Sequence, residues 1–211
     1  MIIANNIEKS FGPQSLFEGV SFLINEGERV GLVGKNGTGK STLFKMILGQ
    51  ESLDSGTLSF PKGYRIGTLE QIIRFTQPTV LKECVQALNP EKQWDQYKAE
   101  IILSGLGFLE KDFHKDPATF SGGYQVRINL CKALLANPNM LLLDEPTNYL
   151  DLQGLTWLEG FLSHSTKAFL VVSHDRYFLD RVVNQIWEMV GKTKTFTVTP
   201  RTSARLRFAW A

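Results

Sequence analysis

The sequence has few cysteines and no long hydrophobic run. Cys84 and Cys131 are the only cysteines among 211 residues and lie in no metal-binding or redox spacing, so we expect two buried thiols in a reducing cytosol. The longest apolar runs, Met140–Leu143 and Ala168–Val172, fall far short of the roughly 20 residues that a membrane span needs. The first residues also lack the charged and apolar segments of a secretion signal. These absences predict a cytoplasmic protein without an integral membrane segment.

Acidic residues are absent from the end of the chain. Residues 192–211 contain five basic residues and no acid, whereas the rest of the chain carries 18 basic residues against 21 acidic ones. The net charge of +2 therefore hides a slightly acidic body and a basic tail. The charge of the body does not indicate nucleic-acid binding. We expect residues 191–211 to form a flexible basic tail, which is either a solvated end or an arm that contacts RNA.

The most informative segment is a glycine-rich loop between a predicted strand and a predicted helix. It reads G-x-x-x-x-G-K-S, follows the apolar run Arg29–Val33 and precedes apolar residues at helical spacing. Such a loop cradles the β and γ phosphates of a nucleotide, because its glycines let backbone N–H groups point inward and the helix N-terminus favours an anion. We expect Lys40 to reach these phosphates and Ser41 to bind Mg²⁺. The predicted nucleotide-binding residues of the loop are Gly34, Lys35, Asn36, Gly37, Thr38, Gly39, Lys40, Ser41 and Thr42.

The order of strand and helix patterns along the chain predicts an α/β fold. Five short apolar or alternating runs predict strands before residue 70, and a helix interrupts them after Lys40. The pattern becomes helical from Thr79 to Ala136, and strands and helices alternate again from Met140 to Met189. This alternation predicts a parallel sheet with helices on its faces and phosphate ligands at the carboxyl ends of the strands. We therefore expect a domain over residues 1–190 with an inserted helical lobe over about 72–136.

A second apolar strand ends in two adjacent carboxylates. The run Met140–Leu143 leads directly into Asp144 and Glu145 at the predicted ligand edge of the sheet. Because a buried strand has no structural use for two acids at its tip, we assign them chemical roles. We expect Asp144 to hold Mg²⁺ and Glu145 to act as the general base for the water that attacks the γ phosphate.

A serine and two glycines precede another predicted helix, Tyr124–Leu135. The serine is a good N-cap and the glycines leave the helix N-terminus open to an anion, although the same triplet is also an ordinary helix start. The chain resembles an ATP-binding-cassette (ABC) ATPase domain over residues 1 to about 190. That superfamily has the same motifs in the same order, namely the glycine-rich loop, Gln71, Ser121-Gly122-Gly123, Asp144-Glu145, Asp151 and His174.

Two further segments resemble the ABC-F branch of this superfamily, whose members have no membrane domain and mostly act on ribosomes. They are Asp144–Asp151, which reads DEPTNYLD, and Ser173–Asp180, which reads SHDRYFLD. The resemblance implies a P-loop NTPase fold with a parallel-sheet core, an antiparallel β subdomain and an inserted helical lobe. It also implies hydrolysis of Mg-ATP between two cassettes, with a second copy or a missing second half as partner, and action on the ribosome or its RNA.

The resemblance further implies roles for single residues. Phe11 would stack on adenine, and Gln71 would lie near Mg²⁺ and the attacking water. His174 would sense the γ phosphate as a catalytic residue beside Glu145. Asp151 would cross to the partner cassette, and Ser121-Gly122-Gly123 would cap the γ phosphate that the opposite cassette holds.

Three departures from the ABC-F pattern keep alternatives open. The chain holds one cassette, the span from Gln71 to Ser121 is too short for the arm that many members insert there, and the family pattern fails from Val198 onward. One alternative is the ATPase subunit of an ABC transporter, which Asn148 and Leu150 disfavour. Another is a half-cassette that binds ATP but does not turn it over alone.

Overall fold

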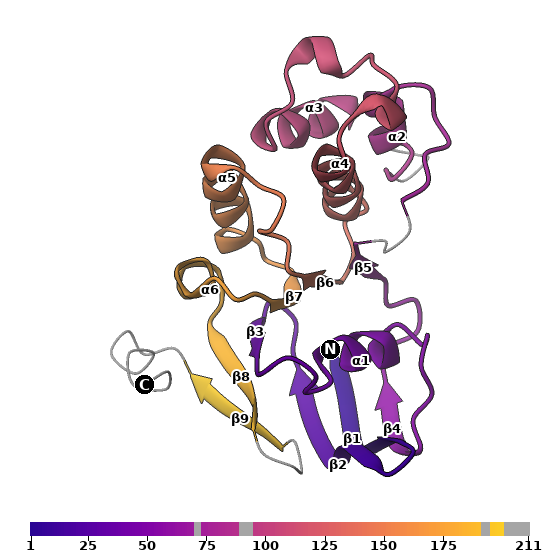
Figure 1. Ribbon diagram of the computed structural model, residues 1–211, viewed down its shortest axis with the longest axis vertical. Coiled ribbons are helices and arrows are strands. Elements are labelled where there is room, and N and C mark those ends of the chain that lie inside the picture. Colours follow the sequence, from indigo (N-terminus) through magenta and orange to yellow (C-terminus); the bar gives the residue numbers. More distant parts are fainter. Residues whose placement is uncertain (70–72, 89–94, 191–194, 201–211) are drawn as a thin grey trace.

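The computed structural model describes residues 1–69, 73–88, 95–190 and 195–200, which form two sheets with the helices packed around the larger one (Figure 1). The larger sheet has the strand order β5-β6-β7-β3-β8-β9, and the smaller has the order β2-β1-β4. The strands are β1 (Ile2–Phe11), β2 (Gln14–Ile24), β3 (Arg29–Val33), β4 (Ser55–Ser59), β5 (Ile66–Thr68), β6 (Met140–Asp144), β7 (Ala168–Val172), β8 (Gln185–Val190) and β9 (Thr195–Pro200).

The α-helices are α1 (Lys40–Ile47), α2 (Val80–Val85), α3 (Gln96–Gly105), α4 (Gly122–Leu135), α5 (Leu152–Ser163) and α6 (Arg176–Val182). Two 3₁₀ helices, η2 (Glu110–Asp112) and η3 (Pro117–Thr119), lie between α3 and α4. Within the described ranges, every helix is too short or too polar to cross a membrane.

The larger sheet has the predicted parallel core. Strands β5, β6, β7, β3 and β8 run parallel to one another, whereas β1 pairs antiparallel with both β2 and β4. Successive side chains of β6 enter different cores, since Leu141 and Leu143 pack with the helices of the lobe while Met140 and Leu142 pack toward α1 and the smaller sheet. The parallel sheet therefore separates two hydrophobic cores, one on each face.

Strand β9 corrects the predicted start of the tail at residue 191. It pairs antiparallel with β8 from Val190 opposite Thr195 to Gln185 opposite Pro200. The segment Thr195–Thr199 is rich in β-branched and aromatic residues, which suit a strand, and an antiparallel neighbour needs only a short connection. The sheet thus continues past the predicted domain boundary. The remainder of the predicted tail, residues 191–194 and 201–211, lies outside the described residues.

The helices α2, α3 and α4 lie between β5 and β6 in the chain, within the predicted span of the helical lobe, and form the upper part of the molecule in Figure 1. Cys84 and Cys131 are fully buried in this lobe, as predicted. Burial and the neighbouring Cys84 raise the pKa of the Cys131 thiol, which favours the neutral form.

A buried carboxylate connects the parts of this lobe. Glu83 of α2 is completely buried, and its side chain accepts hydrogen bonds from the backbone N–H groups of Thr76 and Gln77, both at 2.9 Å. It also accepts from Gln86 Nε2 at 2.6 Å and Lys132 Nζ of α4 at 2.7 Å. Burial alone would raise the pKa of Glu83, but the hydrogen bonds from Lys132, Thr76 and Gln77 hold it below its usual value. Glu83 thus fixes the segment after β5 against α4.

Candidate nucleotide-binding site

The glycine-rich loop runs from the end of β3 into the N-terminus of α1. Gly37 and Gly39 have φ angles of +77° and +101°, a region that residues with a Cβ rarely adopt. A Cβ on Gly39 would also lie 3.1 Å from Phe17 Cζ, so the loop packs closely on β2. Glycine is therefore required for the path that presents the α1 N-terminus to solvent, where a helix favours an anion.

Lys40, the first residue of α1, lies across this loop. Its Nζ donates to the carbonyl oxygens of Gly34 at 2.8 Å and Lys35 at 3.1 Å. An ammonium group has three donors, so one remains for a further acceptor. The loop thus holds an ammonium with a donor to spare at the start of α1, where a helix N-terminus favours a phosphate.

Ser41 and Asp144 come together although they lie 103 positions apart. Ser41 Oγ donates to Asp144 Oδ2 at 3.4 Å, which places a hydroxyl and a carboxylate between α1 and the end of β6. Mg²⁺ prefers oxygen ligands and commonly takes one or two protein groups together with phosphates and water. In the described parts of the chain, no cluster of three or more His, Cys, Asp or Glu could hold a metal alone. The donor set therefore fits a magnesium ion that a nucleotide helps to bind.

Glu145 lies next to Asp144 in a strained backbone conformation, with φ of +46°. Its Oε2 accepts from the backbone N–H of His174 at 3.3 Å, and its Oε1 lies 3.5 Å from His174 Nε2. Oε1 is buried and has no hydrogen-bond partner among the described residues. Burial raises the pKa of Glu145, with Asp144 adding to the effect and the backbone of His174 opposing it. A partly buried carboxylate with a free oxygen and a raised pKa suits a general base.

One cavity of about 360 Å³ gathers these groups. Its lining comprises Leu16, Asn36, Gly37, Gly39, Lys40, Ser41, Thr42, Asp144, Glu145, Val172 and His174. The sequence did not single out Leu16 and Val172, because an apolar wall residue has no signal that distinguishes it from any core residue. A second cavity of about 700 Å³ shares Ser41, Asp144 and Glu145 and extends along α1 toward Val126 of α4.

Other predicted site residues lie away from the 360 Å³ cavity. Phe11 ends β1 with 48% of its surface exposed, so it is not an ordinary core residue. Gln71 lies outside the described residues. The exposed Ser121 precedes α4 as the N-cap, but its side chain makes no capping hydrogen bond. The other two histidines, His114 and His164, are exposed and do not line this cavity.

Asp151 is held within the chain. Its Oδ1 accepts from the backbone N–H of Gly154 and caps α5, and its Oδ2 lies 3.1 Å from an Arg127 guanidinium nitrogen. The same guanidinium donates to the carbonyl oxygens of Leu106 and Tyr149, each at 2.8 Å. Arg127 thus pairs with a neighbouring acid and connects α4 to the segment before α5.

Comparisons with known proteins identify the family of the chain. Residues 17–148 match the family described as "ABC transporter", which is well over half of the chain. The chain belongs to the ABC transporter family. The predicted ABC superfamily is therefore confirmed.

Curated relatives of the cassette include proteins from bacteria and plants. The cassette is 36% identical to "Putative ATP-binding protein YdiF" of Bacillus subtilis, over 88% of its own length and 35% of that protein. It is 38% identical to "Energy-dependent translational throttle protein EttA" of Escherichia coli, over 91% and 36%. It is 33% identical to "ABC transporter F family member 2" of Arabidopsis thaliana, over 90% and 35%. The cassette thus spans about a third of the length of these relatives.

Solved structures show the same fold. A structure titled "Structure of ATP binding subunit of ABC transporter" has a TM-score of 0.80 at 20% identity and covers 99% of this cassette and 93% of that chain. A dimeric ATP-binding cassette with bound ADP and Pi has a TM-score of 0.74 at 22% identity, with coverage of 96% and 100%. The predicted cassette fold, with its parallel core and antiparallel sheet, is therefore confirmed.

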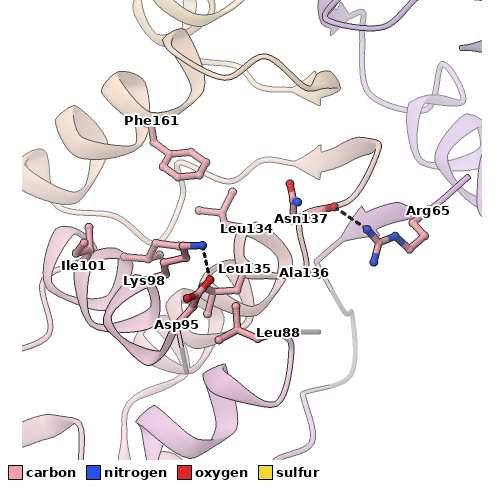
Figure 2. Close-up of a pocket in the computed structure, with 11 residues that line it drawn as sticks. Arg65, Leu88, Asp95, Lys98, Ile101, Leu134, Leu135, Ala136, Asn137 and Phe161 are labelled. Atoms are coloured by element: carbon pink, nitrogen blue, oxygen red, sulfur yellow. Dashed lines mark hydrogen bonds and ion pairs between the residues drawn. The ribbon is translucent and has the colours of Figure 1, made fainter. Parts of the chain in front are cut away.

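A third cavity of about 410 Å³ lies among α3, α4 and α5 of the cassette (Figure 2). Lys98 and Asp95 form an ion pair at its rim, with Nζ 2.5 Å from Oδ2, and Arg65 donates to the Asn137 carbonyl oxygen at 3.2 Å. Its lining shares no residue with the 360 Å³ cavity. This cavity is therefore separate from the phosphate-binding groups.

Proposed function

We propose that this chain is an ABC-F-type cassette that binds Mg-ATP and hydrolyses it together with a second cassette. The observation that supports this proposal most directly is a single cavity at the carboxyl ends of β3, β6 and β7. It is lined by Lys40, Ser41, Asp144, Glu145 and His174. Loop N–H groups and an ammonium suit phosphates, oxygen ligands suit Mg²⁺, and a carboxylate with a raised pKa suits water activation. Hydrolysis of a nucleoside triphosphate needs all three: phosphate binding, a magnesium site and an activated water.

Each residue has a separate task in this proposal. The glycine-rich loop and Lys40 bind the β and γ phosphates, and Ser41 and Asp144 hold Mg²⁺, which neutralises charge on the phosphates when bound. Glu145 accepts a proton from the attacking water through Oε1, the oxygen that has no hydrogen-bond partner among the described groups. His174, which contacts Glu145 through its backbone and its ring, positions that carboxylate and contacts the γ phosphate.

The need for a second cassette is supported by the start of α4. A Cβ on Gly122 would meet nothing within 4 Å, and one on Gly123 would only touch Tyr149 Cδ1 at 4.0 Å. The packing of the chain itself therefore does not require a glycine at either position. A close approach of another molecule explains them, and the uncommitted Ser121 hydroxyl would face it. In this proposal these three residues, with Asp151, complete the phosphate site of the opposite cassette.

The proposed target is the ribosome, and the proposed location is the cytoplasm. One relative at 38% identity is named a translational throttle protein, and another at 33% is named as a member of the F family. The second candidate is the ATPase subunit of a membrane transporter, which the fold similarity to such a subunit favours. ATP-dependent co-sedimentation of the chain with purified ribosomes distinguishes the two.

The test of hydrolysis is the rate per chain measured against chain concentration, for the wild type and for Glu145→Gln. We expect the wild-type rate to rise with concentration, because two cassettes share each site. Glu145→Gln keeps the side-chain shape but removes the base, so turnover should fall by about 10²- to 10⁴-fold while ATP still binds. Full turnover in this variant refutes the role of Glu145, and a rate independent of concentration in a monomeric sample refutes the shared site.

A further inference from the structure

Lys9 of β1 is a buried lysine between two carboxylates. Only 6% of its surface is exposed, and its Nζ lies 2.7 Å from Glu51 Oε1 and 3.3 Å from Asp54 Oδ1. Buried lysines are rare unless they are paired. The hydrogen bond that Lys9 donates to Glu51, together with Asp54, raises the pKa of Lys9 above its usual value, so the ammonium stays charged. The strand thus carries a fixed positive charge at this position.

The same ammonium lies over the ring of Phe11. The distance from Lys9 Nζ to the ring centroid is 5.1 Å, within the range of a cation–π contact. Phe11 is nevertheless 48% exposed. One face of the ring therefore rests on a buried charge, while ring surface remains accessible for a flat partner.

Glu51 and Asp54 also connect this strand to the helix that begins at the phosphate loop. The backbone N–H of Glu51 donates to the carbonyl oxygen of Lys45 in the last turn of α1, at 3.2 Å. Asp54 accepts from the backbone N–H of Ser10 at 2.7 Å and donates its own N–H to the Glu8 carbonyl oxygen at 2.9 Å. Lys9 and its partners thus fix the end of β1, where Phe11 lies, relative to α1.

We propose that Lys9 is a positioning residue for the base of the nucleotide, because it holds the Phe11 ring at a set place relative to the phosphate-binding N-terminus of α1. The inference rests on the proposed nucleotide function and deepens it. A nucleotide engages the ring and the loop together only if the two are correctly spaced. Lys9 therefore contributes to affinity through the base, and the phosphate contacts do not depend on it.

The test compares the dissociation constants of Mg-ATP and Mg-tripolyphosphate, which has the phosphates but no base. Phe11→Leu should weaken ATP binding by about 5- to 150-fold, as expected for a lost base stack. Lys9→Met should weaken ATP binding by at least about threefold and leave tripolyphosphate within about twofold. Lys9→Arg should restore most of the ATP affinity. Lys9→Met combined with Phe11→Leu should bind ATP no more weakly than Phe11→Leu alone, since both changes act through the same ring.

The matched control is Lys98→Met in α3. Lys98 also pairs with an acid, Asp95, and lies 5.8 Å from the ring of an exposed tyrosine, but it lines only the separate 410 Å³ cavity. Lys98→Met should leave the affinities for Mg-ATP and Mg-tripolyphosphate unchanged. If Lys9→Met lowers the folded fraction in thermal unfolding, Glu51→Gln is measured instead, with the same expected pattern.

Three results overturn the inference: equal losses for ATP and tripolyphosphate, additive losses in the double variant, or unchanged ATP affinity in Lys9→Met. A wild-type chain that binds neither ligand refutes the proposed nucleotide function itself. If the wild-type chain binds tripolyphosphate and ATP equally well, the phosphate site stands, but the role of Lys9 in positioning the base is refuted.

Discussion

Removing the Glu83 carboxylate should destabilise the helical lobe more than removing its partner, the Lys132 ammonium. Glu83→Ala leaves the Lys132 ammonium, whose side chain is only 18% exposed, without its partner, and it leaves the backbone N–H groups of Thr76 and Gln77 without acceptors. Breaking a buried ion pair in this way costs about 3 to 5 kcal/mol. Lys132→Met should cost less, about 1 to 2 kcal/mol, because the carboxylate keeps its other donors.

The assay is urea unfolding at pH 7, with the free energy of unfolding taken from the midpoint and slope of each variant. Glu110→Ala, at an exposed position of η2, is the control and should stay within about 0.5 kcal/mol of the wild type. A loss below about 1 kcal/mol in Glu83→Ala, or a larger loss in Lys132→Met, refutes the assignment of Glu83 as the organising group.

The same carboxylate predicts how stability changes with pH. The pKa of Glu83 in the folded chain lies below its ordinary value of 4.5. Its ionised form therefore stabilises the fold fully above the pKa of the unfolded chain, and this contribution is lost as the pH falls through the lower folded value. The difference in unfolding free energy between the wild type and Glu83→Gln should shrink below about pH 4. A difference that stays constant down to pH 3 contradicts this.

Two further changes test the site directly. Lys40→Ala should raise the dissociation constant of ATP and not merely slow turnover, since the ammonium contacts phosphate in the bound ground state. The exposed control Lys62→Ala should leave this constant unchanged. If isothermal titration calorimetry finds the same dissociation constant for Lys40→Ala and the wild type, the assignment of the phosphate loop is wrong. Glu145→Gln should form an ATP-dependent dimer that light scattering detects, and adding Ser121→Arg to this variant should abolish the dimer. A dimer that persists in the double variant contradicts the predicted contact.

The sequence predicts those parts of the cassette whose signal is local. The glycine-rich loop fixes its own backbone, so its sequence alone predicts its conformation. An apolar run that ends in Asp144 and Glu145 likewise predicts a buried strand with acids at its tip. The partners of Lys9 are not, because Asp54 lies 45 positions away and the pairing depends on how β1 packs beside the segment after α1. Strand β9 also escapes prediction, since a short run of Thr, Phe and Val near basic residues is compatible with either a tail or an edge strand.

The two hydrophobic cores on opposite faces of the parallel sheet make the molecule modular. Leu141 and Leu143 belong to the core of the helical lobe, whereas Met140 and Leu142 belong to the core beneath the phosphate loop, and the same alternation runs along β7. A substitution or insertion among α2, α3 and α4 therefore disturbs packing on one face, while the residues that shape the loop rest on the other. Evolution can remodel α2, α3 and the later turns of α4 for a new partner at little risk to the phosphate loop, whereas the start of α4 stays bound to the proposed contact with the opposite cassette. Protein engineers can use the same division.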